Sequence, residues 1–157
     1  MNGGNALQES EPDYRARARA VREDLLRFDL SKQHLKVLFW IVELSYGWGL
    51  ESVRIPKLGV LKELTGMSVA NLSTTIKELH AMRLLLASRA EGGVDYKVQP
   101  DCDKWHCRPL TTPSMVQHAK DWLKVYNLGD SGAKVVEAFV PVELDYPTNQ
   151  TTGTTEE

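Results

Sequence analysis

The chain's 157 residues, 42% hydrophobic and 25% charged, are typical of a globular protein with one main domain and argue against intrinsic disorder. The longest apolar run spans only residues 37–42 and the N-terminus lacks a secretion signal, so we expect no membrane span and a cytoplasmic location. The formal net charge of -2 at pH 7 argues against a uniformly basic nucleic-acid binder, and any attraction to DNA must come from a local surface.

The N-terminal part of the chain predicts a helix after a flexible start. Residues 1–11 are small and polar with no periodicity, so we expect a flexible N-terminus. Pro12 and Asp13 suit a first helical turn, and the stretch to Phe28 is rich in Ala, Leu and Arg. Two interpretations of the charged face remain open, a basic stripe for DNA or an acidic partner, and a solvated face paired with neighbouring acids. Its arginines are Arg15, Arg19 and Arg22, and the acids are Glu23 and Asp24.

A second helix is predicted to form the centre of the core. Ser31 is placed to cap it, and the segment that follows carries a broad apolar face. That face consists of Leu35, Leu38, Phe39, Ile41, Val42 and Tyr46. Gly47 and Gly49 mark the end of the helix, and residues 52–55 suit a small strand.

The next segment predicts a helix-turn-helix. A short helix is marked by three leucines, and Thr65-Gly66-Met67 suits a tight turn before Ser68, which caps a longer helix. The leucines are Leu58, Leu61 and Leu64, and the apolar face of the longer helix consists of Val69, Leu72, Ile76 and Leu79. Two helices joined by a short turn that contains glycine form this motif, which also occurs in domains that bind only proteins.

The hydrophobic period changes after Met82 and predicts a hairpin. Residues 84–90 and 94–98 have the pattern of two strands, and Glu91-Gly92-Gly93 between them is a glycine turn signal. A helix-turn-helix followed by a hairpin is a winged helix, so the predicted fold class is mainly α with a small β-hairpin. We expect residues 12–108 to form one winged helix-turn-helix domain that includes the arginine-rich helix.

The C-terminal part of the chain, residues 109–146, predicts another helix and a possible strand at residues 135–144. Thr112 caps and Pro113 begins this helix, whose apolar stripe is expected to pack against its own domain or a dimer mate, or to dock a partner. The stripe consists of Val116, Ala119, Trp122, Leu123 and Tyr126. Residues 147–157 form a polar, acidic tail that is predicted to be disordered.

The distribution of charge indicates where DNA would bind. Residues 52–90 contain six basic and two acidic side chains, whereas residues 109–157 contain three lysines and seven acids. The second helix of the motif offers polar groups for base edges and phosphates, namely Ser68, Asn71, Ser73, Thr74, Thr75 and Lys77. The flanking strand and the hairpin add Arg54, Lys57, Arg89 and Lys97 for backbone phosphates. Because this helix carries few cations, we expect weak or partner-assisted binding of double-stranded DNA.

The sequence offers no convincing site for catalysis, and we expect no enzymatic activity, metal or cofactor. Cys102, His106 and Cys107 lie close together, but a structural zinc site needs four ligands and no second Cys/His pair is present. The other histidines lack the nucleophile and carboxylate context of a catalytic site, and there is no phosphate-binding loop or dinucleotide motif. They are His34, His80 and His118.

Several motifs between Asp29 and Cys107 follow one another in a recognisable order. They are DLSKQHLKVLFWIVELSYGW with Tyr46-Gly47-Trp48, ELTGMSVANLSTTIKELHAMRLL with Glu63-Leu64-Thr65, and DCDKWHC with Trp105. In order and spacing they resemble the N-terminal domain of the bacteriophage lambda replication protein O family. The resemblance implies a winged helix that binds repeats in a phage replication origin, usually as a dimer, while a separate C-terminal region recruits the host helicase machinery.

Three functions remain open from the sequence. The first is a phage or prophage replication initiator, a homodimer that recognises origin DNA and contacts host helicase-loading proteins. The second is a winged-helix transcription regulator, and the third is a protein-interaction module that has lost DNA binding. A repeat array near the gene favours the first function over the second, and the lack of salt-sensitive duplex binding favours the third.

Overall fold

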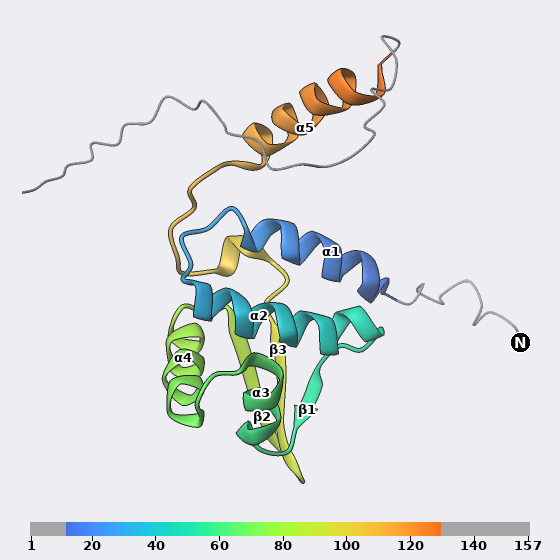
Figure 1. Cartoon of the computed structure of the whole chain (residues 1–157). Coiled ribbons are helices and arrows are strands. Elements are labelled where there is room, and N and C mark those ends of the chain that lie inside the picture. The colour runs from blue at the N-terminus through green and yellow to red at the C-terminus, as the bar shows by residue number, and fades with distance from the viewer. Residues whose placement is uncertain (1–11, 130–157) are drawn as a thin grey trace, which may run out of the picture. The chain divides into compact units, whose positions relative to one another are not determined.

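The computed structural model describes residues 12–129, and its helices and strands follow the predicted order (Figure 1). The elements are α1 (Tyr14–Leu25), α2 (Lys32–Leu44), η2 (Tyr46–Trp48), β1 (Val53–Ile55), α3 (Leu58–Thr65), α4 (Val69–Ala81), β2 (Leu85–Ala90), β3 (Gly93–Val98), η3 (Cys102–Lys104) and α5 (Pro113–Leu128). Mainly helical structure with a small antiparallel sheet confirms the predicted fold class. The chain divides into two units within α5, between Gln117 and His118, so α5 is described by itself.

Local capping residues determine where the helices begin. Ser31 caps α2, where its hydroxyl accepts a hydrogen bond from His34 N–H and the His34 ring accepts one from Ser31 N–H. Ser68 caps α4 by accepting from Asn71 N–H at 3.1 Å. Both predicted caps are confirmed. Asp13 was predicted to lie in the first turn of α1, but it is the N-cap residue before that turn, where its carboxylate accepts a hydrogen bond from Ala16 N–H.

The predicted end of the first two helices was too late along the chain. α1 ends at Leu25 instead of Phe28, which forms an isolated bridge with Pro109. α2 ends at Leu44, and the three residues from Tyr46 form the separate 3₁₀ helix η2. Tyr46 is nevertheless fully buried, and its hydroxyl donates to Val98 O at 2.6 Å. The tighter turn therefore brings a residue of the predicted apolar face onto the sheet.

The turn between α3 and α4 is the one that the sequence predicts. Gly66 adopts a left-handed conformation with φ 75°, and its N–H donates to Lys62 O at 2.8 Å. Thr65 Oγ1 donates to Leu61 O and accepts from Met67 N–H, so the buried Thr65 satisfies backbone groups on both sides of the turn. These contacts set the direction in which α4 leaves the turn.

The sheet has β3 in its middle, in the order β1-β3-β2, and both pairings are antiparallel. β2 and β3 form the predicted hairpin, and β1 is the predicted strand at residues 52–55. β1 lies very close to β3 where Ile55 pairs with Val94. A Cβ atom at position 93 would lie only 2.5 Å from Ile55 O, so any residue larger than glycine would clash there. Glycine at position 93 therefore lets β1 join the hairpin.

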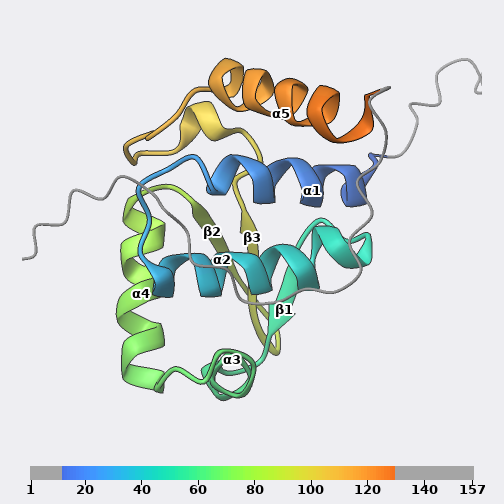
Figure 2. The same cartoon turned by 45° about the horizontal axis from the view of Figure 1, so that its top comes forward.

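α2 is the centre of the core, as predicted. It contacts α1, α3, α4 and β3, and Figures 1 and 2 show α1 on one side of it and the sheet with α3 and α4 on the other. The side chains that are at most 1% exposed include Val21, Leu25, Leu38, Ile41, Leu61, Leu72, Leu79 and Leu85. Trp105 closes the core. Its ring and that of Phe28 form a T-shaped pair with 5.0 Å between the ring centroids, and its indole N–H donates to Gln99 O.

α5 begins where the sequence predicts, and Thr112 Oγ1 accepts from Met115 N–H at its start. The helix has no buried residue, and its Trp122 and Tyr126 rings stack 5.2 Å apart. Among residues 12–129, no helix is long and apolar enough to cross a membrane. The flexible N-terminus predicted at residues 1–11, the strand at 135–144 and the tail at 147–157 lie outside the described residues.

Candidate nucleic-acid interface

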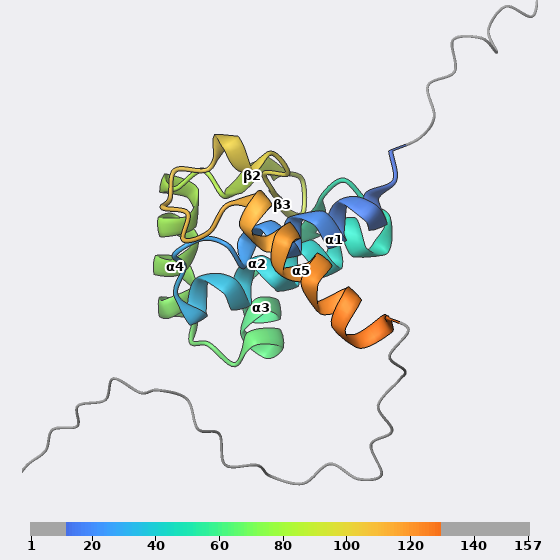
Figure 3. The same cartoon turned by 90° about the horizontal axis from the view of Figure 1, so that it is seen from above.

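The outer face of α4 carries an exposed polar ridge. α4 lies at the margin of the domain in all three overall views (Figures 1, 2 and 3). Asn71, Thr74 and Lys77 are exposed at a spacing of three residues, and Ser73 is half-buried beside them. Helical residues three and four apart are neighbours, so these side chains form one ridge on the side away from the core. Ser68 precedes the ridge, with its hydroxyl occupied by the cap.

Two residues of α4 differ from the prediction in their exposure. Thr75 is 3% exposed, so its predicted contact with DNA is wrong. It lies three residues after Leu72 and four before Leu79, and both of these are fully buried, so the helical period turns Thr75 inward. Val69 was assigned to the apolar face but is 44% exposed, because it lies in the first turn of α4, beyond the packed part of the helix.

The two hairpin cations that were predicted to contact phosphates, Arg89 and Lys97, lie at different distances from the turn. Arg89 pairs with Val94, next to the turn, and is exposed. Lys97 lies three residues further back, opposite Leu86, and its Nζ lies 2.9 Å from Glu51 Oε2. The hydrogen bond from Lys97 holds the pKa of Glu51 below its ordinary value. Lys97, which was predicted to contact a backbone phosphate, is therefore set back from the turn, and its charge is matched by a carboxylate.

Arg54 is also neutralised by its position in the sheet. It lies opposite Asp95 in the register of β1 and β3, and two of its nitrogens contact the two carboxylate oxygens at 2.8 and 3.2 Å. The hydrogen bond between them lowers the pKa of Asp95 and raises the pKa of Arg54, so both groups stay charged. A bidentate pair of this kind leaves little net charge for a phosphate.

Other cations near the helix-turn-helix lack an acidic partner. Within the part of the chain that the structure describes, five make no ion pair, namely Lys57, Lys62, Lys77, Arg83 and Arg89. Glu78 of α4 is instead held by His34, with Oε1 and Nε2 2.9 Å apart. The basic character predicted for residues 52–90 thus comes from these five side chains, while Arg54 contributes little.

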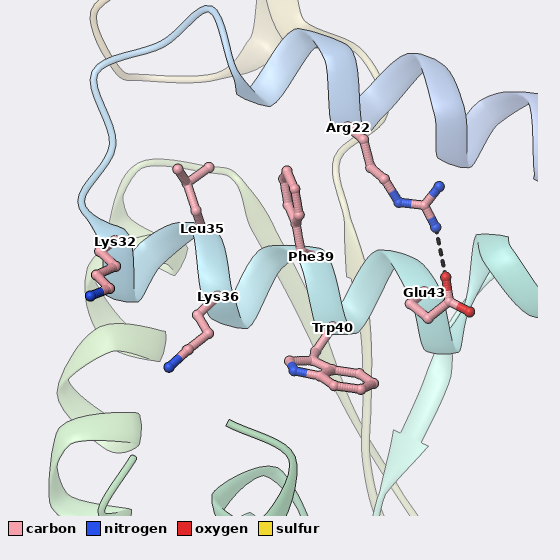
Figure 4. Close-up of a pocket in the computed structure, with 7 residues that line it drawn as sticks. All are labelled: Arg22, Lys32, Leu35, Lys36, Phe39, Trp40 and Glu43. Carbon is pink, nitrogen blue, oxygen red and sulfur yellow. Dashed lines mark hydrogen bonds and ion pairs between the residues drawn. The ribbon is translucent and has the colours of Figure 1, made fainter. Parts of the chain in front are cut away.

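A separate apolar groove runs along α2 and the facing side of α1 (Figure 4). It is lined by Arg22, Lys32, Leu35, Lys36, Phe39, Trp40 and Glu43. Leu35 and Phe39 point toward α1, and Arg22 reaches Glu43 with 2.8 Å between nitrogen and oxygen. Arg22 is therefore paired with an acid of another helix, Glu43 of α2. The apolar centre of the groove suits contact with protein better than contact with phosphate.

The two cysteines have the surroundings of structural thiols. Cys102 and Cys107 are both half-buried and form no disulfide bond, and burial raises the pKa of each thiol. A raised pKa lowers the fraction of reactive thiolate at neutral pH. Across residues 12–129, no three His, Cys, Asp or Glu side chains are grouped so that they could hold a metal ion.

A helix-turn-helix with an exposed polar ridge on its second helix, followed by a hairpin, defines a winged-helix-like domain of the helix-turn-helix class. The sequence model of the bacteriophage replication protein O family matches residues 7–105, which is more than half of the chain. The chain belongs to this family, and the resemblance seen in its motifs is confirmed. The protein is therefore a phage replication protein. It matches no curated protein and no solved structure.

Proposed function

We propose that this protein is a replication initiator of a phage or prophage and that it recognises origin DNA through α4 and the β2–β3 hairpin. The observation that carries the proposal is the ridge of Asn71, Thr74 and Lys77 on the outer face of α4. The second helix of a helix-turn-helix lies in the major groove of DNA. Membership of the replication protein O family supports a role in phage replication.

Each side chain of the ridge suits a particular contact. The Asn71 amide can donate and accept together, which matches the N6 and N7 edge of adenine. Thr74 can bond a base edge or a phosphate, and Lys77 is placed for a phosphate. The exposed Val69, which the sequence assigned to the core, offers an apolar surface for a thymine methyl group.

The proposal is tested by selecting bound fragments from random DNA and from the source genome at low salt. We expect one genomic region with repeated sites, because an initiator acts at its origin. Sites dispersed upstream of several genes would instead indicate a transcription regulator. If no fragment binds in a salt-sensitive manner, the chain is a protein-interaction module and the proposal fails.

The hairpin provides a second test, because its two cations differ in their surroundings. Replacing Arg89 with glutamine should weaken binding equally on all duplexes and lower the slope of log affinity against log salt by about 1. Lys97→Gln is the matched control and should change the slope less, since Lys97 is already paired with Glu51. Fluorescence anisotropy at several salt concentrations measures both slopes. An unchanged slope in Arg89→Gln would show that the hairpin tip does not touch DNA.

We also propose that the protein is a homodimer in which α5 contributes to the interface. α5 exposes a large apolar stripe, in which Trp122 is 59% exposed and Tyr126 52% exposed. Large aromatic residues are enriched at the centres of interfaces, and a two-fold dimer doubles the number of phosphate contacts. Dimerisation would therefore offset the shortage of cations on α4.

Light scattering at micromolar concentration tests the dimer. We expect the natural chain to be dimeric and Trp122→Ala to dissociate, since losing a central tryptophan weakens binding by about 2 kcal/mol or more, roughly thirtyfold. Lys124→Ala, a change of an exposed residue on the opposite face of the same helix, is the control and should remain dimeric. A monomeric natural chain contradicts the dimer. A dimer that persists in folded Trp122→Ala would show that the interface lies outside this stripe.

A further inference from the structure

A basic pocket lies at the C-terminal end of α4, outside the ridge. It has a volume of about 470 Å³ and is lined by His80, Arg83, Leu86, Gln99, Lys104 and His106. These residues come from the end of α4 and the turn that follows it, from β2, and from the segment between β3 and α5, and no carboxylate is among them. Arg83 and Lys104 make no ion pair within residues 12–129. The pocket therefore joins two unneutralised cations with nitrogen donors.

The backbone of Arg83 has a conformation that residues other than glycine rarely adopt. With φ 58°, Arg83 is the one non-glycine residue of the described chain that has a positive φ. Its N–H donates to His80 O and Leu84 N–H donates to Leu79 O, which is the Schellman ending of a helix. Glycine is the usual residue at this position because it adopts the left-handed conformation without strain. A strained arginine here points to a use for its side chain.

The other side of the pocket is held rigidly against the end of α4. His106 N–H donates to Met82 O at 2.7 Å, and the adjacent Trp105 is 5% exposed. Lys104 is the last residue of η3 and directly precedes this buried tryptophan. The nearby Asp101 and Asp103 do not line the pocket, and Asp101 is occupied by a hydrogen bond from Asp103 N–H. Lys104 is thereby presented beside Arg83, although 20 residues separate them in the sequence.

The pocket continues along the flank of α4 toward the ridge. His80 also lines a neighbouring cavity of about 300 Å³, whose other lining residues are Ile76, Lys77, Leu85, Ala87 and Tyr96. Cations therefore follow this flank from Lys77 to Arg83 and Lys104. If α4 lies in the major groove, the groups beside it face the phosphates that border that groove.

We propose that Arg83 and Lys104 bind a backbone phosphate of duplex DNA, next to the bases that the ridge contacts. A guanidinium and an ammonium beside other nitrogen groups match the oxygens of a phosphate, and a site without carboxylates does not repel them. The contact is independent of base sequence and adds affinity that the weakly charged ridge lacks. This inference rests on the proposed function, since it takes α4 to be the DNA-contacting helix.

The variant Arg83→Gly separates the role in binding from the role in folding. Glycine relieves the left-handed strain, so the variant should melt at the same temperature as the natural chain or higher when unfolding is followed by circular dichroism. It should nevertheless bind duplex DNA more weakly, by the same factor on the selected site and on random sequence. One lost phosphate contact lowers the salt slope by about 0.9, so its affinity deficit should shrink about threefold between roughly 50 and 200 mM salt.

Lys104→Gln provides a second variant in the pocket. Arg19→Gln controls for the loss of one charge, because Arg19 is exposed on α1, which lies on the side of α2 away from α4 (Figures 1 and 2). We expect Lys104→Gln to behave as Arg83→Gly does and Arg19→Gln to keep the natural slope. If the natural chain binds no duplex, the proposed function itself fails. If the natural chain binds and both pocket variants keep its slope, or if Arg19→Gln loses as much, the phosphate site is refuted while the role of the ridge stands.

Discussion

Replacing Asn71 with alanine should weaken binding to the selected duplex by about 1–3 kcal/mol and leave binding to random DNA nearly unchanged. The Asn71 side chain makes no hydrogen bond within residues 12–129. Its backbone N–H donates to the Ser68 cap, and alanine keeps that N–H. Alanine also favours a helix more than asparagine does, so the fold should not suffer. The whole loss in affinity can therefore be assigned to the base contact.

Thr74→Ala extends this experiment and Lys77→Gln controls it. Thr74 is exposed one turn after Asn71, and its loss should also fall mainly on the selected duplex. Lys77→Gln removes a phosphate contact and should weaken both duplexes equally. Competition between labelled selected duplex and unlabelled random duplex measures the difference directly. Equal losses on both DNAs for Asn71→Ala would show that the ridge does not read bases.

Replacing Leu72 with alanine should lower the free energy of unfolding by about 2–5 kcal/mol. Leu72 is fully buried in α4, where it contributes to the core together with Leu61 and Leu79. The loss combines the transfer free energy of the deleted groups with the cavity that remains. Because single domains are stable by only about 5–15 kcal/mol, this one change threatens the folded state at physiological temperature.

Val69→Ala is the matched control for Leu72→Ala, since both shorten an aliphatic side chain of the same helix. Val69 is 44% exposed, and its replacement should change stability by no more than about 0.5 kcal/mol. Urea unfolding followed by circular dichroism measures both variants. Similar losses in the two variants would mean that the assignment of buried and exposed faces on α4 is wrong, and with it the position of the ridge.

The features that the sequence predicted well are those set by neighbours along the chain. Ser31 and Ser68 cap helices because a hydroxyl reaches an N–H only three residues away. Gly66 ends α3 because the left-handed conformation favours glycine. The change of period after Met82 predicted the hairpin because alternation is a property of the strand itself. The motifs between Asp29 and Cys107 also sufficed to indicate the family.

The tertiary structure decided which of the predicted site residues are available. The register of the sheet places Arg54 opposite Asp95, and the fold brings Lys97 to Glu51, so two expected phosphate ligands are neutralised by partners distant in sequence. Thr75 lies three and four residues from the buried Leu72 and Leu79, but its hydroxyl kept it out of the apolar face that the sequence predicted.

The same reasoning applies to the pocket at the end of α4. The sequence shows Arg83 as one cation among several in residues 52–90, and nothing local connects it with Lys104 or His106. Their proximity depends on the hydrogen bond from His106 N–H to Met82 O and on the burial of Trp105, which form only when the chain returns to the helix after the hairpin. Local chemistry along the chain thus determined the elements and the family, whereas the charges left free to meet DNA were decided by pairings that exist only in the folded domain.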